Sequence, residues 1–232
     1  MNKLMSTKIK KAKQIINGIY RKLTPFFSEQ FRWYLAQKIE KIAWDGWLKK
    51  NSSTMDKKWL DIVLEYFELE GKEDFKDKML VDIGSGPIGI LTRLKAKEKI
   101  AVDPLQVNLI DASIRRIKAP GEKIPLNSQI ADGVFLYNVL QHVISPEKVL
   151  KEGGRILKKG GIFYILEQLN IPIDVSHLHS LNLKMFDEWI LKNNFKIIKK
   201  TFENDHYLNS DPFIPVIPGS RYAILCLILV KI

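Results

Sequence analysis

The chain has 232 residues, of which 46% are hydrophobic and 27% are charged, a balance typical of a soluble globular protein. The longest apolar run, residues 222–230, is too short to cross a bilayer as a helix, and no signal-peptide pattern is evident at the N-terminus. The single cysteine, Cys226, cannot form an internal disulfide. Composition therefore excludes a membrane-spanning or disulfide-framed protein and favours a cytoplasmic one with an α/β domain and an appendage.

The charge is concentrated at the N-terminus. The whole chain carries +11, and residues 1–50 hold 12 basic and 3 acidic residues, a charge of +9. The remainder of the chain is nearly neutral. This distribution predicts a basic arm on a neutral core.

The sequence pattern of residues 1–74 predicts a basic helical extension. Apolar residues recur at three- and four-residue steps in three stretches, each pattern amphipathic and helical. Thr24-Pro25 and the polar run at residues 51–54 separate the stretches. Their apolar positions are Ile9, Ala12, Ile16, Ile19 and Leu23; Phe31, Leu35, Ile39, Ile42, Ala43, Gly46 and Trp47; and Trp59, Val63 and Phe67.

Residues 75–232 alternate between short apolar runs and helical patterns, which indicates crossover connections and a largely parallel sheet. We predict a Rossmann-like seven-stranded, mostly parallel α/β sheet with helices on both faces. The last strand, at 221–230, is expected to be antiparallel. The expected strands are 79–83, 99–103, a short one within 111–118, 134–137, 162–166, 195–203 and 221–230, and the expected helices are 88–94, 146–157 and 185–193.

A glycine-rich turn follows the first predicted strand, in the run V-D-I-G-S-G-P-I-G at residues 81–89. Glycines here let the backbone turn sharply and approach a ligand, and ligands of open α/β sheets bind at the carboxyl ends of the strands. The spacing Gly84-x-Gly86-x-x-Gly89 alone also fits a dinucleotide site. Asp103, which ends the second predicted strand, can accept hydrogen bonds from both hydroxyls of a ribose. These residues predict a nucleoside ligand.

The downstream sequence identifies the ligand class by resemblance. Asp82 two residues before Gly84, the run G-E-K-I-P-L at 121–126, and the series from Ala131 through His142 to Gly161 closely resemble the methyltransferase domain of ubiquinone/menaquinone-type and many small-molecule methyltransferases. The resemblance covers about residues 78–167. It implies a class I S-adenosylmethionine-dependent methyltransferase. In this pattern Asp132 aligns with the family's usual aspartate at the start of the fourth strand. Gly153 and Gly154 lie within the helix expected at 146–157 and are expected to weaken it.

Carried over residue by residue, the resemblance implies cofactor contacts along the whole ligand. Asp82, Gly84, Ser85 and Gly86 would line its methionine end, and Asp103 would hold the ribose. Pro104 and Leu105 would flank the adenine, with Glu122 and Lys123 in the loop beside it, and Asn138 and Val139 would face the methionine and sulfonium.

Candidates for the acceptor side follow the fourth and fifth predicted strands. His142 is the catalytic candidate, because a neutral imidazole there could take a proton from a hydroxyl acceptor; ordering of the loop is the alternative. His177, His179 and Glu167 are candidate substrate contacts. No metal site is expected, since His177 and His179 lack matched acids. Most of the aromatic side chains at 33, 34, 44, 47 and 59 are expected to pack the extension onto the core, and one or two to line the acceptor pocket.

The predicted function is methyl transfer to a small-molecule acceptor, such as a saccharide or lipid precursor. Two alternatives stay open: an RNA methyltransferase that grips RNA with the basic arm, and a non-catalytic partner-binding module with a vestigial cofactor pocket. Residues 1–23 are expected to contact an anionic membrane or a protein partner, which would place a cytoplasmic protein at the inner membrane surface.

Overall fold

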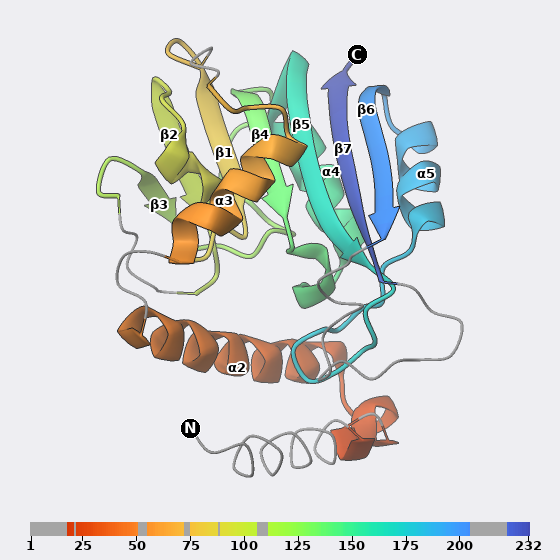
Figure 1. Ribbon diagram of the computed structural model, residues 1–232. Helices are drawn as coiled ribbons and strands as arrows, with labels where there is room; N and C mark the ends of the chain where they lie inside the picture. The colour runs from red at the N-terminus through yellow and green to blue at the C-terminus, as the bar shows by residue number, and fades with distance from the viewer. Residues whose placement is uncertain are drawn as a thin grey trace.

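The computed structural model describes residues 18–20, 22–50, 55–71, 75–87, 89–105, 111–204 and 222–232. Their centre is a seven-stranded sheet in the order β3-β2-β1-β4-β5-β7-β6 (Figure 1). The first five strands in this order, β3, β2, β1, β4 and β5, pair in parallel. Strand β7 pairs antiparallel with both β5 and β6. The predicted sheet with one antiparallel strand is confirmed. The strands are β1 (Met79–Ile83), β2 (Glu98–Val102), β3 (Arg115–Ile117), β4 (Ala131–Tyr137), β5 (Leu157–Leu169), β6 (Phe195–Asn204) and β7 (Ala223–Lys231).

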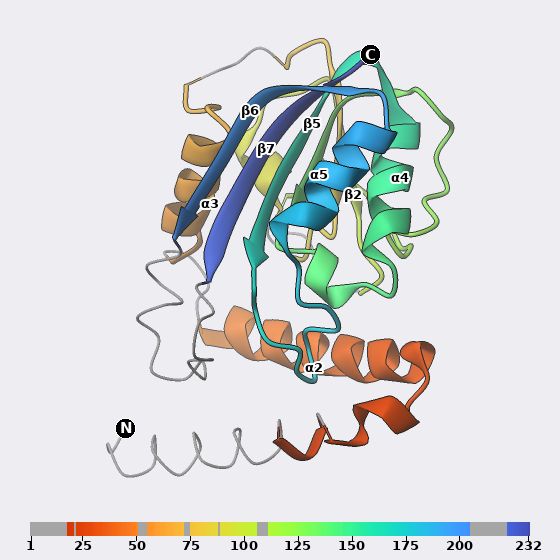
Figure 2. The ribbon, with the colours of Figure 1, turned by 90° about the vertical axis from the view of Figure 1, so that its right-hand side faces the viewer.

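Helices cover both faces of this sheet. Helix α3 (Met55–Tyr66) lies on one face, and α4 (Pro146–Ile156) and α5 (Leu183–Lys192) lie on the other (Figure 2). Phe67, just after α3, contacts Phe135 of β4 with ring centroids 6.0 Å apart, while Trp189 of α5 contacts Phe163 of β5 at 6.1 Å. Both faces of β4 and β5 are covered, which explains why the central residues of these strands are nearly all apolar.

Helix α4 begins as its sequence predicts. The Ser145 side chain accepts a hydrogen bond from the backbone N–H of Lys148, and Pro146 occupies the first turn. Helix α4 continues through Gly153 and Gly154, which were expected to weaken it. A Cβ on Gly153 would lie 2.4 Å from Cζ of Phe163. That glycine is needed so that the helix can pack closely on β5.

Two further expectations change. The helix predicted at 88–94 is a short 3₁₀ turn, η2 (Ile90–Arg93), which buries only Ile90 and Leu91. Most of the helix predicted over residues 9–23 lies outside the described residues; its end leads into the 3₁₀ turn η1 (Thr24–Phe26). No helix of the described residues is long and apolar enough to cross a membrane.

Helix α2 (Glu29–Lys50) has an unexpected position. It runs across the edge of the sheet where the parallel strands end, below the strands in Figure 1. The face turned to the sheet is not the apolar stripe predicted from the sequence, because Phe31 and Ile42 are 45% and 71% exposed. Ala36, fully buried, marks the inner face instead. A helix that covers polar loops rather than an apolar core has to carry polar groups inward.

Candidate active site

The glycine turn after β1 has the tight geometry that its sequence predicts. Gly84 and Gly86 have φ values of +72° and +55°, in the left-handed region that glycine tolerates. The Gly84 N–H donates to the Val102 carbonyl of β2 at 2.7 Å. A Cβ on Gly84 would lie 2.5 Å from Cγ2 of Val139, the residue two beyond β4. The turn and the end of β4 therefore approach so closely that only glycine fits.

Asp82, in β1, is fully buried without a charge partner. Neither of its carboxylate oxygens makes a well-formed hydrogen bond with the described residues. Burial raises the pKa of Asp82 well above its usual range and the Asp103 carboxylate raises it further, while the backbone N–H of Ile90 lowers it. A buried, unpaired carboxylate is costly. A cationic ligand group, such as the ammonium of a methionine moiety, would remove that cost.

Asp103 follows β2 and is 5% exposed. Its Oδ2 accepts from the Gly86 N–H at 2.8 Å and its Oδ1 from the Leu105 N–H at 2.7 Å, with an Arg116 guanidinium nitrogen 3.9 Å away. Burial raises the pKa of Asp103, and these three groups oppose the rise. Each oxygen keeps a further lone pair. The carboxylate is thus fixed beside the glycine turn with acceptor capacity for a pair of hydroxyls.

The remaining predicted adenine-side residues form the surrounding loops. Pro104 and Leu105 are half-buried directly after Asp103. Oε1 of Glu122 accepts from the backbone N–H groups of Ile144 and Ser145 at 2.7 and 3.2 Å, which ties its loop to the start of α4. Lys123 is exposed.

Ser85, predicted to lie at the methionine end, is buried, with its hydroxyl 3.3 Å from the Gly86 carbonyl.

Hydrogen bonds to a buried acidic residue of β5 hold the segment that follows β4. Oε1 of Glu167, a residue 1% exposed, accepts from the Val139 and Leu140 N–H groups at 2.9 and 3.1 Å, and its Oε2 has no hydrogen-bond partner among the described residues. Burial raises the pKa of Glu167 to about 8, although both N–H groups lower it. Asn138, with φ +57°, turns the chain there and accepts from Gln141 Nε2 at 3.3 Å. Glu167 therefore fixes the loop that carries Asn138 and Val139.

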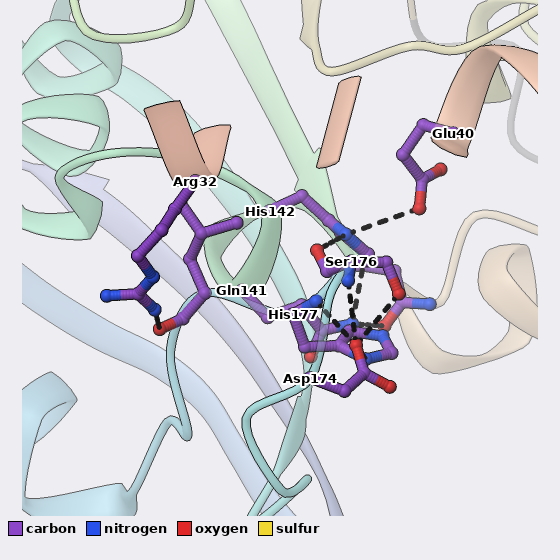
Figure 3. A network of polar contacts seen from close by, with 9 residues as sticks. Arg32, Glu40, Gln141, His142, Asp174, Ser176 and His177 are labelled. Atoms are coloured by element: carbon purple, nitrogen blue, oxygen red, sulfur yellow. Dashed lines mark hydrogen bonds and ion pairs between the residues drawn. The ribbon is translucent and has the colours of Figure 1, made fainter. Parts of the chain in front are cut away.

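His142 lies in η3 (Leu140–His142), beside the long loop that follows β5. Its Nδ1 is 2.9 Å from the Ser176 carbonyl, and its ring centroid is 4.9 Å from that of His177 (Figure 3). Burial lowers the pKa of His142 to about 3, and His177 contributes to the lowering. The imidazole is therefore neutral near pH 7. His179 is held apart from this pair by contacts of its Nε2 with the Val143 and Ile144 carbonyls at 2.9 and 3.1 Å.

Helix α2 adds two residues that sequence reasoning missed, Arg32 and Glu40, and brings Trp44 of the aromatic cluster to the same edge. Glu40 Oε1 lies 3.5 Å from Nδ1 of His142, and Arg32 donates to the Leu178 carbonyl at 3.0 Å (Figure 3). Cζ2 of Trp44 comes within 3.4 Å of the Cβ position that Gly86 lacks. The four-residue spacing of Arg32, Ala36, Glu40 and Trp44 was the available signal. Of the aromatic cluster, Trp44 packs on the glycine turn, Tyr34 is 52% exposed, and the side chains of Trp47 and Trp59 lie outside the described residues.

The site is confined to the carboxyl edge of the sheet. Asp132, the second residue of β4, lies at the opposite edge, where it accepts from the Met79 N–H at 2.8 Å and pairs with Lys158 at 2.9 Å. A cavity of about 250 Å³ borders Asp132, Lys78 and Lys158 there and contains no predicted site residue. Within the described ranges, no cluster of three or more His, Cys, Asp or Glu side chains is arranged to hold a metal ion.

Comparison with known proteins identifies the domain. Residues 81–165 match the family model described as a methyltransferase domain, and among curated proteins none matches the chain by sequence.

Solved structures share the fold at low identity. The [4+2]-cyclase SpnF is 15% identical, with a TM-score of 0.57 over 75% of this chain and 80% of its own. The YcgJ protein of Bacillus subtilis is 14% identical, with a TM-score of 0.55 over 74% and 98%. Geranyl diphosphate C-methyltransferase of Streptomyces coelicolor, solved with S-adenosyl-L-homocysteine, is 14% identical, with a TM-score of 0.56 over 76% and 78%.

The domain match and the fold agree. Residues 81–165 match a methyltransferase domain, and the described residues share their fold with solved structures that include a methyltransferase bound to S-adenosyl-L-homocysteine, the demethylated form of S-adenosylmethionine. The residues present fit that group. Asp82 offers buried oxygens that make no well-formed hydrogen bond with the described residues, and the glycines of the Gly84–Gly86 turn leave space where side chains would stand.

Proposed function

We propose that the protein transfers a methyl group to a small-molecule acceptor, with a saccharide or lipid precursor as the expected class. The observation that carries this proposal is the position of α2 across the carboxyl edge of the sheet, with Arg32 bonded to Leu178 and Trp44 against Gly86. A helix laid over the site restricts the size of an acceptor. That favours a small molecule over a folded nucleic acid.

The charges near the site support the same proposal. Glu40, Asp103, Glu167 and Asp174 supply carboxyl groups, and Asp103 lies close enough to Glu40 to raise its pKa. A phosphate backbone would meet these acids rather than a cationic groove. The alternative of an RNA methyltransferase therefore rests on the basic arm alone.

In the proposed complex, Asp82, Gly84, Ser85 and Gly86 hold the methionine end and Asp103 accepts from the ribose hydroxyls. Pro104, Leu105, Glu122 and Lys123 shape the adenine side, and Asn138 and Val139 face the sulfonium. The bound cofactor supplies an electrophilic methyl group. The protein contributes positioning, exclusion of water and, for a weakly acidic acceptor, a base, for which His142 and His177 are the candidates.

Calorimetry and a transfer assay test this function. We expect S-adenosylhomocysteine to bind with a micromolar dissociation constant and NAD not to bind. Methyl-labelled cofactor should label small molecules in a protein-free extract of the source cells. Label that enters only RNA would favour the RNA alternative. Cofactor binding without transfer to any fraction would favour the partner-binding module, and absence of cofactor binding would overturn the proposal.

We also propose that the protein is cytoplasmic and that residues 1–23 attach it to an anionic membrane surface. Support comes from the +9 charge of residues 1–50 and from Ile19, Leu23 and Phe26, which are 54%, 44% and 83% exposed. The protein should float with vesicles that contain phosphatidylglycerol, less so at 0.5 M salt, and not with phosphatidylcholine alone. Replacement of Lys8, Lys10, Lys11 and Lys13 by Gln should abolish flotation. Unchanged flotation of this variant would contradict the proposal.

A further inference from the structure

His177 and Asp174 form a dyad in the loop between β5 and α5. Oδ1 of Asp174 lies 3.0 Å from Nδ1 of His177 and also accepts from the Ser176 and His177 N–H groups at 2.8 and 2.9 Å (Figure 3). His177 and these N–H groups hold the pKa of Asp174 well below its usual range, although burial opposes them. An ionised carboxylate only accepts hydrogen bonds. Nδ1 of His177 therefore carries the proton, and its Nε2 keeps a lone pair.

The Nε2 atom of His177 is available. It makes no hydrogen bond within the part of the chain that the structure describes, and the side chain is 23% exposed. His142 differs, because its Nδ1 faces the Ser176 carbonyl at 2.9 Å and its Nε2 faces the Gln141 amide nitrogen at 3.4 Å. Both nitrogens of His142 are engaged. Of the two adjacent imidazoles, whose rings are tilted by 43°, His177 is the one prepared to take a proton.

This dyad lies where the cofactor and acceptor sides meet. Glu40 of α2 is 3.5 Å from His142. Burial is the main cause of the raised pKa of Glu40; His177 lowers the pKa, and Asp103, the proposed ribose ligand, raises it further. Glu40 thus stands between the two sides. The side chains that surround this point include the carboxyl groups of Glu40, Asp103 and Asp174, which would repel an anion. This arrangement favours an acceptor that carries no negative charge.

We propose that Nε2 of His177 is the general base of the reaction, that Asp174 positions it, and that the acceptor is a molecule without anionic groups that presents a hydroxyl group. This inference rests on the proposed function. As the bond between acceptor oxygen and methyl carbon forms and the sulfur–methyl bond breaks, the hydroxyl proton passes to Nε2. The products are the methyl ether, the neutral thioether and a protonated His177, which then releases its proton to water.

The first test uses the free protein. Long-range ¹H–¹⁵N spectra distinguish the two neutral tautomers of each of the four histidines, with His177→Gln and His142→Asn used for assignment. We expect His177 to be protonated at Nδ1 and bare at Nε2. In Asp174→Ala this preference should be lost. A proton on Nε2 of His177 in the neutral wild-type ring would overturn the proposal.

The second test measures turnover. A protein-free extract is separated on an anion exchanger, and transfer is assayed with the unretained and the retained fractions. We expect transfer with the unretained fraction, a loss of about 10²- to 10⁴-fold in kcat for His177→Ala, and partial recovery with added imidazole. The matched variant His142→Asn, which keeps a donor to the Ser176 carbonyl, should not respond to imidazole.

The outcomes separate this inference from the proposed function. S-adenosylhomocysteine should bind the wild type and His177→Ala with the same affinity, and loss of binding in the wild type would contradict the function itself. Normal binding with full turnover in His177→Ala would overturn the role of His177. Transfer that occurs with the retained, anionic fraction but not with the unretained fraction would overturn the acceptor class.

Discussion

Glu40 Oε1 lies 3.5 Å from Nδ1 of His142, although the two residues come from the N-terminal extension and from the end of β4. The division of the chain into an N-terminal extension at 1–74 and a cofactor-binding domain at 75–232 remains a prediction. In the structure, however, α3 contributes Val63 and Leu64 to the core and α2 contributes Glu40 and Trp44 to the site. The extension is thus part of the site as well as an appendage.

The first prediction concerns the proposed ribose contact. Asp103→Ala removes a fixed carboxylate and its charge-assisted hydrogen bonds, so we expect cofactor affinity to fall by about 2–3 kcal/mol. Calorimetry with S-adenosylhomocysteine measures this. Asp132→Ala is the matched control, because Asp132 also accepts from a backbone N–H but lies at the opposite edge of the sheet. Equal affinity for wild type and Asp103→Ala would show that the ribose binds elsewhere.

The second prediction compares two glycines with nearly equal φ. Gly84 (+72°) faces Val139, whereas Gly160 (+74°) has no heavy atom within 4 Å of its missing Cβ. Gly160→Ala should lower the free energy of unfolding by about 1–2 kcal/mol, the cost of the left-handed backbone. Gly84→Ala should cost more, because its Cβ would overlap Cγ2 of Val139 at 2.5 Å. Urea unfolding of both variants decides this, and equal losses would contradict the close approach.

The sequence predicted which residues lie together at the carboxyl edge of the sheet wherever a signal lies within one strand and the turn that follows. Asp82, Gly84 and Asp103 lie at the ends of parallel strands that neighbour each other in the sheet, as the α/β pattern requires. Glu40 could not be found in this way. Its contacts with His142 join residues 102 positions apart in the sequence, and the periodicity of α2 indicated the wrong face. Apolar periodicity identifies a face that packs on a core, and the inner face of α2 packs on loops.

The third prediction concerns pH. Burial raises the pKa of Glu167 from 4.5 to about 8, so between these values the unfolded chain has lost a proton that the folded chain keeps. Stability from this group is full below pH 4.5 and is lost as pH rises to 8. Between pH 6.5 and 8 the free energy of unfolding should fall by at most about 1.4 kcal/mol per pH unit from this group.

Urea unfolding from pH 6.5 to 9 measures the effect. Glu167→Gln keeps an acceptor for Val139 and Leu140 without a titrating group, so its slope should be flatter. Asp82 shifts in the same direction, so Asp82→Asn combined with Glu167→Gln should flatten the slope further. Glu147→Gln, exposed in the first turn of α4, serves as control. Parallel slopes for wild type and Glu167→Gln would rule out the buried neutral acid.

The fourth prediction tests how α2 is held over the site. Arg32 donates to the Leu178 carbonyl at 3.0 Å, and the Leu178 N–H donates to the Gln141 carbonyl at 2.7 Å, so α2, the β5–α5 loop and the end of β4 are joined in series. Arg32→Ala removes a hydrogen bond from a charged donor, which should lower the free energy of unfolding by about 1.5–3 kcal/mol. Deuterium exchange measured by mass spectrometry should become faster in peptides from α2 and from residues 170–182. Lys38→Ala is the control, because Lys38 lies on the outer face and contacts the Tyr34 ring at 5.3 Å. If both variants exchange alike, Arg32 does not hold the helix over the site.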